Sequence, residues 1–307
     1  MTIRSDMWLG FAIVMATIFI LDLGVFNRKS HEIRFREALA WTLVWLLLAL
    51  AFNAGICHFM GPVKALEFLT GYLIEESLSV DNLFVFIMIF CYFQVSKKDQ
   101  PKILKWGILG ALATRGVFIM VGIGLMERFH WMLYLFGGML LVTGLKMAFG
   151  GEQKVEPGKN LLVRLAGKLF PVARQGGNGR FFVRENGTIA MTPLFLTLLV
   201  VESSDVIFAV DSIPAVLAVT RDPFIVYTSN VFAIMGLRSL YHLLANVMEM
   251  FAYLKLGISF VLAFVGIKML AADIYPIPIH FSLGVIVGIL AVAIAASLTI
   301  PKKQDGA

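Results

Sequence analysis

Six carboxylates lie inside long apolar stretches of the chain, where a charge is costly. One stretch, VVESSDVIFAVDSIPAV, covers residues 200–216, and another, TGYLIEESLSVDNLFVF, covers residues 70–86. A charge at the centre of a bilayer costs about 2.5–3.5 kcal/mol on insertion scales, so ionisable residues at that depth are functional by default. The carboxylates are Glu75, Glu76, Asp81, Glu202, Asp205 and Asp211.

The polar groups in these stretches are all oxygen donors, and neither Cys nor His lies among them. Hard oxygen ligands suit Mg²⁺, Ca²⁺ or Mn²⁺ rather than Zn²⁺ or Cu²⁺. The sequence therefore predicts a site for a hard divalent cation. Its candidate ligands are Glu75, Asp81, Asn82, Glu202, Asp205, Asp211 and Ser212.

Four basic residues also fall within the apolar stretches, namely Arg115, Lys146, Arg238 and Lys268. They leave a simpler interpretation open, in which the acids only form structural ion pairs with them. For the two lysines we favour ion pairing or snorkelling towards the interface. For Arg115 and Arg238 we expect a role in orienting the acids.

The elements that must position these groups are membrane-spanning helices. The chain has 307 residues, is 59% hydrophobic and has a mean hydropathy of +0.85, well above the soluble globular class. A span needs about 20 mainly apolar residues. We predict an all-α polytopic membrane protein with one transmembrane domain and nine spans, at 8–26, 38–60, 65–93, 103–125, 131–149, 191–220, 223–245, 254–272 and 279–300.

The distribution of Lys and Arg orients these spans. With the N-terminus outside, 18 of the 26 basic residues lie in inner loops, four lie outside and four lie within spans. The positive-inside rule therefore predicts an outer N-terminus and a cytoplasmic C-terminus. The net charge of +6 comes from these loops and is no sign of nucleic-acid binding. In the inner loop 150–190, we expect an interfacial helix from Lys159 and a hairpin around Asn186 and Gly187.

The chain also contains an internal repeat of three spans. Residues 65–149 and 191–272 align so that four polar pairs coincide. Because three is odd, the second copy enters the membrane from the opposite side, which is typical of secondary transporters. Spans 3 and 6 are unusually long, and Pro214 frees a backbone carbonyl near Asp211, so we expect both helices to be broken. The pairs are Glu75 with Asp205, Asp81 with Asp211, Arg115 with Arg238 and Lys146 with Lys268.

The two acidic stretches, with DPFIVYTSNVFAIMGLRSLY at 222–241 and the flanking motifs, closely resemble the TerC family, including its Alx-type manganese exporters. The resemblance covers nearly the whole chain. It implies a bacterial inner-membrane protein of the wider LysE-type exporter superfamily that exports Mn²⁺ as its substrate, with no permanently bound cofactor, and links to tellurite resistance or metal supply to exported enzymes. It places Glu75, Asp81, Glu202, Asp205 and Asp211 at the transport site, whereas many relatives carry Lys at the position of Glu76.

Other functions stay open at this point. One is a non-transporting membrane scaffold that assists an exported enzyme, and another is export of a small organic cation or amino acid. An enzyme is least expected, because no set of nucleophile and base and no cofactor motif occurs in the sequence. The oligomeric state and the coupling ion are not determined by the sequence.

Overall fold

The computed structural model describes residues 5–20, 35–149, 161–169, 171–173, 179–185, 188–245, 253–275 and 277–299. Within these ranges the fold is almost entirely helical, with one two-stranded sheet. The helices are α1 (Ser5–Ile20), α2 (Phe35–Met60), α3 (Pro62–Tyr92), α4 (Gln100–Arg128), α5 (Met132–Phe149), α6 (Leu161–Leu169), α7 (Pro193–Leu217), α8 (Pro223–Leu244), α9 (Leu254–Leu270) and α10 (Ile279–Thr299). The strands are β1 (Phe182–Glu185) and β2 (Thr188–Met191).

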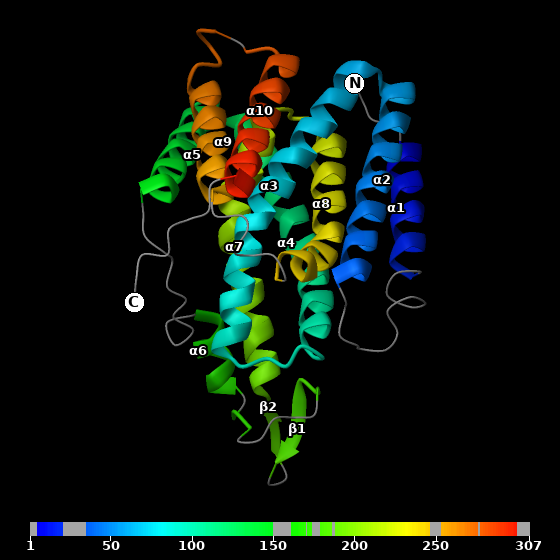
Figure 1. Cartoon of the computed structure of the whole chain (residues 1–307), viewed down its shortest axis with the longest axis vertical. Coiled ribbons are helices and arrows are strands. Elements are labelled where there is room, and N and C mark those ends of the chain that lie inside the picture. Colours follow the sequence, from blue (N-terminus) through cyan, green and yellow to red (C-terminus); the bar gives the residue numbers. More distant parts are fainter. Residues whose placement is uncertain are drawn as a thin grey trace.

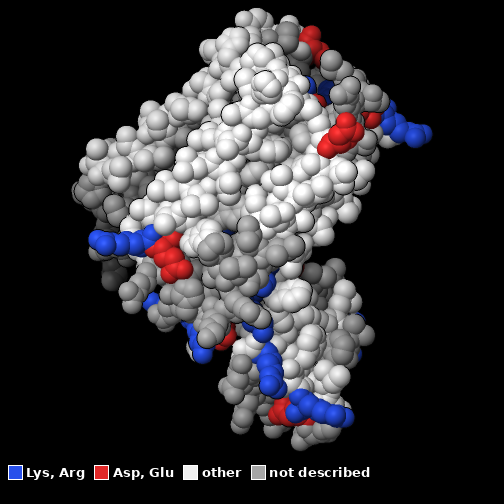
Figure 2. Space-filling model, turned by 90° about the vertical axis from the view of Figure 1, so that its right-hand side faces the viewer, with Lys and Arg blue, Asp and Glu red and all other residues white. Residues whose placement is uncertain are grey.

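The long helices form a bundle in which α3, α4, α7 and α8 are central (Figure 1). In the view of Figure 1, α1 and α2 flank the bundle on one side, α5, α9 and α10 flank it on the other, and α6 and the strands extend from its lower end. Figure 2 shows a wide face without charged side chains between a charged upper rim and a charged lower part. A surface without charged side chains is what a bilayer requires of the part that it surrounds.

Each of the nine predicted spans contains a helix, and five of these helices are long and apolar enough to cross a membrane. They are α2, α4, α5, α7 and α10, and α1 contributes a shorter apolar helix over Asp6–Ile18. The chain is therefore a helical membrane protein. Nine spans and their inverted repeat stay predictions, because helicity alone does not place a helix across a bilayer.

The predicted breaks in spans 3 and 6 are wrong for this conformation. The third long helix runs without interruption from Pro62 to Tyr92, and α7 continues through Asp211 and Pro214 to Leu217. Pro214 lies in the last turn of α7, three residues before the helix ends. Its missing N–H removes one helical hydrogen bond, but only a short segment of helix follows that position.

Helices α5 and α9 cross at unusually short range, because a glycine on each helix faces the backbone of the other helix. A Cβ built on Gly144 would lie 2.7 Å from the carbonyl oxygen of Ser259 and 2.9 Å from the nitrogen of Ala263. A Cβ built on Gly266 would lie 2.8 Å from the carbonyl oxygen of Gly137. Small residues at a membrane helix crossing allow this backbone approach, and a larger side chain would separate the helices.

The segment before α7 forms the predicted small structure at the lower end of the bundle. The expected interfacial helix is α6, and the expected hairpin is the antiparallel pair β1–β2, in which Phe182 is opposite Met191. The turn residues 186–187 lie outside the described residues. Lys102 at the start of α4 donates a hydrogen bond to the carbonyl oxygen of Gly179, so this segment is attached to the lower end of α4.

Candidate functional site

One arginine lies at the centre of the bundle. Arg115, in the middle of α4, has 1% of its surface exposed and forms ion pairs with Glu75 of α3 and with Asp205 of α7, the latter at 3.2 Å. Both carboxylates are also buried. A buried charge is tolerated when it is paired and hydrogen-bonded, so this cluster is the chemical reason why three charges can occupy the bundle core.

The fourth central helix, α8, completes the cluster through an amide. Arg115 Nη1 donates a hydrogen bond of 3.0 Å to Asn230 Oδ1, and Asn230 Nδ2 donates one of 3.0 Å to Glu75 Oε2. Ser212 Oγ of α7 accepts a longer contact, 3.4 Å, from Arg115 Nη1. We name Glu75, Arg115, Asp205, Ser212 and Asn230 the central cluster.

The central cluster keeps acceptor capacity that its own members do not use. Asp205 Oδ2 is buried without a hydrogen-bond partner among the described residues, and Glu75 Oε1 faces the guanidinium without a well-oriented hydrogen bond. With all three charged groups ionised, two carboxylates face one guanidinium and the cluster carries an excess negative charge. Such an arrangement favours a cation as a further partner.

Apolar layers flank the central cluster along its helices. Towards the upper end, the buried side chains are Ile119 and Ile123 of α4 and Ile213 and Val216 of α7. Towards the lower end, they are Phe86 and Phe90 of α3, Ile103 and Leu104 of α4 and Val200 of α7. The central cluster thus has buried apolar side chains above and below it on the same helices.

Glu202 lies one turn below Asp205 on α7 and faces α4. Its carboxylate occupies the place where a side chain at Gly110 would be. A small cavity of about 20 Å³ is lined by Glu202, Asp205 and Arg238 together with apolar side chains. About 10–15 Å³ is enough to hold one water molecule. Glu202 and Arg238 thus line a small, largely apolar cavity that reaches Asp205 of the central cluster.

The remaining predicted ligands lie elsewhere. Asp211 is half-buried and accepts a hydrogen bond of 3.2 Å from Thr143 of α5, on the face of α7 turned away from Arg115. Asn82 is buried lower on α3, and the side chain of Asp81 lies outside what the structure describes. Within the described residues, no three side chains of the His, Cys, Asp or Glu type form a group that could hold a metal ion. The structure thus gathers Glu75, Asp205 and Ser212 around Arg115, with Glu202 and Arg238 beside them.

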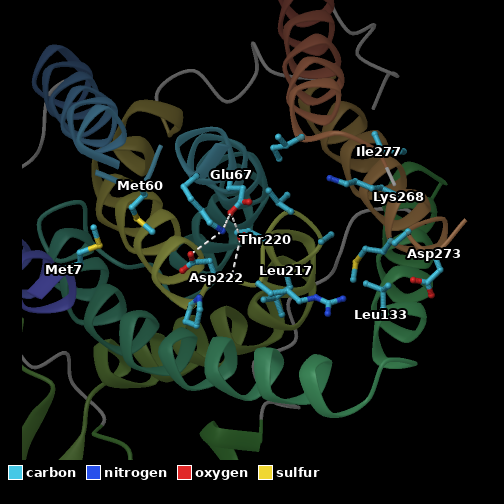
Figure 3. Close-up of a pocket in the computed structure, with 18 of the residues that line it drawn as sticks. Met7, Met60, Glu67, Leu133, Leu217, Thr220, Asp222, Lys268, Asp273 and Ile277 are labelled. Carbon is cyan, nitrogen blue, oxygen red and sulfur yellow. Dashed lines mark hydrogen bonds and ion pairs between the residues drawn. The ribbon is translucent and has the colours of Figure 1, made fainter. Parts of the chain in front are cut away.

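A second polar region lies at the upper end of the bundle, in a cavity of about 1240 Å³ (Figure 3). It is bordered by the first turn of α3, the loop between α7 and α8, and the segment after α9. Leu217 lines it on the side of the apolar layer described above. Its charged lining residues are Lys64, Glu67, Arg221, Asp222, Lys268 and Asp273. We call this space the upper vestibule.

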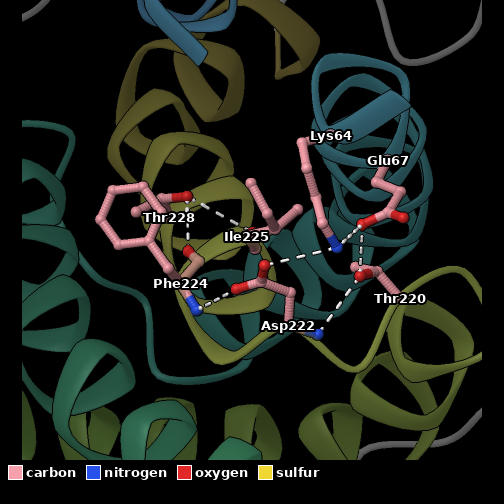
Figure 4. Close-up of polar contacts among 7 residues, drawn as sticks. All are labelled: Lys64, Glu67, Thr220, Asp222, Phe224, Ile225 and Thr228. Carbon is pink, nitrogen blue, oxygen red and sulfur yellow. Dashed lines mark hydrogen bonds and ion pairs between the residues drawn. The ribbon is translucent and has the colours of Figure 1, made fainter. Parts of the chain in front are cut away.

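Lys64 of α3 links this wall of the upper vestibule by an ion pair to the wall formed by the loop between α7 and α8 (Figure 4). Its Nζ lies 2.7 Å from Glu67 Oε2 and 3.3 Å from Asp222 Oδ2. Thr220 donates a hydrogen bond of 2.5 Å to the same Glu67 oxygen, and Asp222 accepts one of 3.1 Å from the N–H of Phe224 at the start of α8. Burial alone would lower the pKa of Lys64, but the hydrogen bonds and charges of Glu67 and Asp222 outweigh it, so the pKa is raised.

Sequence reasoning missed two of these features. Asn230 is absent from the predicted ligands, whereas it bridges Glu75 and Arg115. Lys64 is likewise absent from the predicted site residues, whereas it forms ion pairs with Glu67 and Asp222 in the upper vestibule. The spacing of Lys64 and Glu67, three apart on one helix face, is the local signal that pointed to part of this network.

Comparison with known proteins extends the similarity along almost the whole chain. The model of the integral membrane protein TerC family matches residues 60–305. A membrane protein of Myxococcus xanthus is 49% identical over 95% of this chain and 92% of its own length. A candidate membrane-bound redox modulator of Escherichia coli K12, named Alx, is 47% identical over 97% of this chain and 96% of its own length. No solved structure shows significant similarity to the chain.

Proposed function

Since the chain belongs to the TerC family of integral membrane proteins, we propose that it exports Mn²⁺ from the cytoplasm across the bacterial inner membrane by alternating access. The observation that carries this proposal is the central cluster, in which carboxylates from α3 and α7 meet on one arginine between two apolar layers. A hard dication binds oxygen donors of this kind. Alternating access places the substrate site near the middle of the span, between the two repeats.

In this mechanism Arg115 is the resident counter-ion of the acids. The guanidinium balances Glu75 and Asp205 in the described conformation. An arriving Mn²⁺ competes with Arg115 for the two carboxylates, and Ser212 and Asn230 supply neutral oxygens next to them. Glu202, in the adjoining water-sized cavity, provides a carboxylate on the lower approach to the site. Asp81 and Asp211 belong to the same proposed path, and we expect Asp211→Asn to reduce export while Thr143 still donates to the amide oxygen.

The way the helices pair supports the proposed inverted repeat. If α3, α4 and α5 correspond to α7, α8 and α9, a two-fold axis pairs α3 with α8 in the same way as α4 with α7, and both pairs pack. The α5–α9 crossing adds a reciprocal contact, because Gly144 meets Ser259 and Ala263 while Gly266 meets Gly137 and Leu141. The same sequence offset converts the contacts of Gly144 into those of Gly266, as expected of an isologous interface.

The proposed orientation makes the upper vestibule the exit to the outside. Nine spans with an outer N-terminus place the lower end, with α6 and the strands, on the cytoplasmic side. Reporter fusions test this orientation: a reporter after the last residue should be active in the cytoplasm, and activity outside would contradict it.

The experiment that decides the function is metal flux by the purified protein in proteoliposomes. We expect Mn²⁺ flux above that of protein-free vesicles, with Ca²⁺, Mg²⁺ and Zn²⁺ compared under the same gradient. A folded protein that moves none of these ions would favour the scaffold alternative. Flux of an amino acid or organic cation in place of Mn²⁺ would favour the third alternative.

The relative is described as a redox modulator, but the two cysteines of this chain do not form a dithiol pair. Cys57 lies near the upper end of α2 and Cys91 near the lower end of α3, and both are exposed and unbonded. At 1.5 Å per residue, positions at opposite ends of such helices are separated by roughly 30 Å or more. A disulfide requires Cα atoms within about 7 Å, so these two cysteines are not partners of each other.

A further inference from the structure

We propose that a polar latch closes the upper end of the contact between α3 and α7, and that it must release in every transport cycle before the cation can leave. The upper latch consists of Lys64, Glu67, Thr220 and Asp222 (Figure 4). Its role in transport rests on the proposed function, whereas its role in holding the two helices together can be tested without any flux.

The upper latch joins the first helices of the two proposed repeats. Lys64 and Glu67 lie in the first two turns of α3, and Thr220 lies three residues after the end of α7. The hydroxyl of Thr220 donates its hydrogen bond to the same Glu67 oxygen that pairs with Lys64, so one carboxylate oxygen receives both groups. Lys64 also pairs with Asp222, the N-cap residue of α8, so the latch holds the start of α8 as well.

Below the upper latch, the same faces of α3 and α7 stay in contact down to the central cluster. Each face carries three residues at intervals of four, which helical spacing places above one another. They are Glu67, Gly71 and Glu75 on α3, and Ser212, Val216 and Thr220 along α7. This spacing extends to Thr220, because its N–H bonds to the carbonyl oxygen of Val216 at 3.2 Å. We call this contact the seam, and it ends at Arg115, which contacts both Glu75 and Ser212.

The middle of the seam leaves no room for an ion. A Cβ built on Gly71 would lie 3.2 Å from Val216 Cγ1 and 3.0 Å from Ser229 Oγ of α8. A Cβ built on Gly122 of α4 would lie 3.0 Å from Leu217 Cδ1 of α7. Val216 itself has 0% of its surface exposed. Because this interior is close-packed, a cation can pass along the seam to the upper vestibule only after α3 and α7 separate.

The strength of the upper latch suits a contact that opens and closes. The side chains of Lys64, Glu67 and Asp222 keep 31%, 15% and 12% of their surface exposed. Ion pairs that stay in contact with water contribute little to stability, because solvent screens them. The ion pairs of Arg115 in the central cluster are buried by contrast. The latch can therefore release while the core of the bundle stays folded.

A glycine at the start of α3 provides a pivot for this release. Gly61 is the single residue between α2 and α3, and its φ of +91° lies in the region that favours glycine. A Cβ built there would meet no described atom within 4 Å, so the backbone conformation and not the packing calls for glycine. Hinges are a few residues at the ends of elements that take up backbone rotation. Rotation at Gly61 moves Lys64 and Glu67 away from the loop between α7 and α8.

Thiol labelling of the purified protein in detergent tests the seam without transport. In a parent protein with Cys57→Ser and Cys91→Ser, Val216→Cys places a single thiol in the seam, and we expect a water-soluble maleimide to label it slowly. Lys64→Met and Thr220→Val each remove one arm of the latch and should speed this labelling severalfold. Lys64→Arg keeps the charge and should keep the labelling slow.

Two control variants show whether the effect belongs to the latch. Lys268→Met removes the same charge from the same vestibule, where Lys268 has no ion pair among the described residues, and should leave the labelling of Val216→Cys unchanged. Phe86→Cys places the thiol lower on α3, where labelling should not respond to Lys64→Met. The proposal is overturned if Lys64→Met leaves the labelling of Val216→Cys unchanged, or if Lys268→Met speeds it equally, or if Phe86→Cys responds in the same way.

Flux in proteoliposomes tests the release step. In the same parent, Glu67→Cys with Thr220→Cys places two thiols at the latch, and a short bismaleimide should join them. Once mass spectrometry shows the link, Mn²⁺ flux should be lost, whereas the same reagent should leave flux in either single variant. Full flux through the cross-linked protein would refute the need for release. Absence of Mn²⁺ flux in the wild type would instead refute the proposed function, and the labelling rates would still decide whether the latch holds the seam closed.

Discussion

Removal of Arg115 tests whether the central cluster is a transport site or a structural ion pair. In Arg115→Gln, Glu75 and Asp205 lose their shared cation while both stay buried. Breaking a buried ion pair by removing one partner costs about 3–5 kcal/mol, because a charge is left uncompensated. Total stabilities are about 5–15 kcal/mol, so the variant should lose a large part of its thermal stability in detergent.

Glu75→Gln should behave differently. It leaves Arg115 with Asp205 and Asn230, and the new amide oxygen can still accept from Asn230. We expect a cost of about 1–2 kcal/mol, in the range of one altered hydrogen bond to a charged group. The protein should fold normally and lose Mn²⁺ export, because one of the two carboxylates that hold the dication is gone.

The double variant Glu75→Gln with Arg115→Gln separates the two interpretations. Its loss of stability should be smaller than the sum of the two single losses, by a coupling of about 2 kcal/mol between residues in direct contact. Thermal unfolding of the four proteins gives this cycle, and flux in proteoliposomes gives the function. Export restored to the level of the wild type would mean that Glu75 and Arg115 are only structural partners. An Arg115→Gln variant as stable as the wild type would contradict the buried ion pair itself.

Two further outcomes follow from the close contacts and the exposed loops. Gly110→Ala should destabilise the protein by about 1–3 kcal/mol and reduce export, because its methyl group displaces the Glu202 carboxylate. Gly124→Ala, with open space around it, should keep the flux and raise the unfolding temperature slightly, because alanine favours a helix by about 0.5–1 kcal/mol over glycine. Equal effects of both substitutions would refute this role of Glu202. The hydrogen bond from Tyr134, followed by that from His130, lowers the pKa of Asp273. The link between α5 and the segment after α9 should therefore persist at pH 5 and weaken only as the pH falls below the ordinary aspartate value of about 3.9. Hydrogen exchange across 271–275 measures this link, and loss of protection already near pH 6 would contradict the prediction.

The sequence predicted the helices well because their signal is local. Apolar length and the distribution of basic residues depend on neighbours along the chain, and each predicted span contains a helix. The amphipathic α6 and the hairpin were equally local signals, and both are confirmed. By contrast, the breaks at Asp81 and Asp211 were inferred from helix length and one proline, and packing along α3 and α7 outweighs both.

The candidate site was predictable in composition but not in arrangement. Glu202 and Asp205, three residues apart, share a face of α7 by helix spacing. Asp211 was predicted at the same site through a broken helix, but α7 is continuous and Asp211 accepts from Thr143 on another face. The rotation of one helix against another is not encoded in such spacing. It decides that Glu75 faces Arg115 while the adjacent Glu76 faces Gly236, and it makes Asn230 a bridge.

The crossing of α5 and α9 has a mechanical consequence. Where backbone meets backbone at Gly144 and Gly266, the two helices have no layer of side chains between them that could deform or slide. We therefore expect the two helices to stay together in the proposed transport cycle. In that cycle, the central cluster would open at the side-chain-lined contacts of α3, α4, α7 and α8, while the α5–α9 crossing keeps its arrangement.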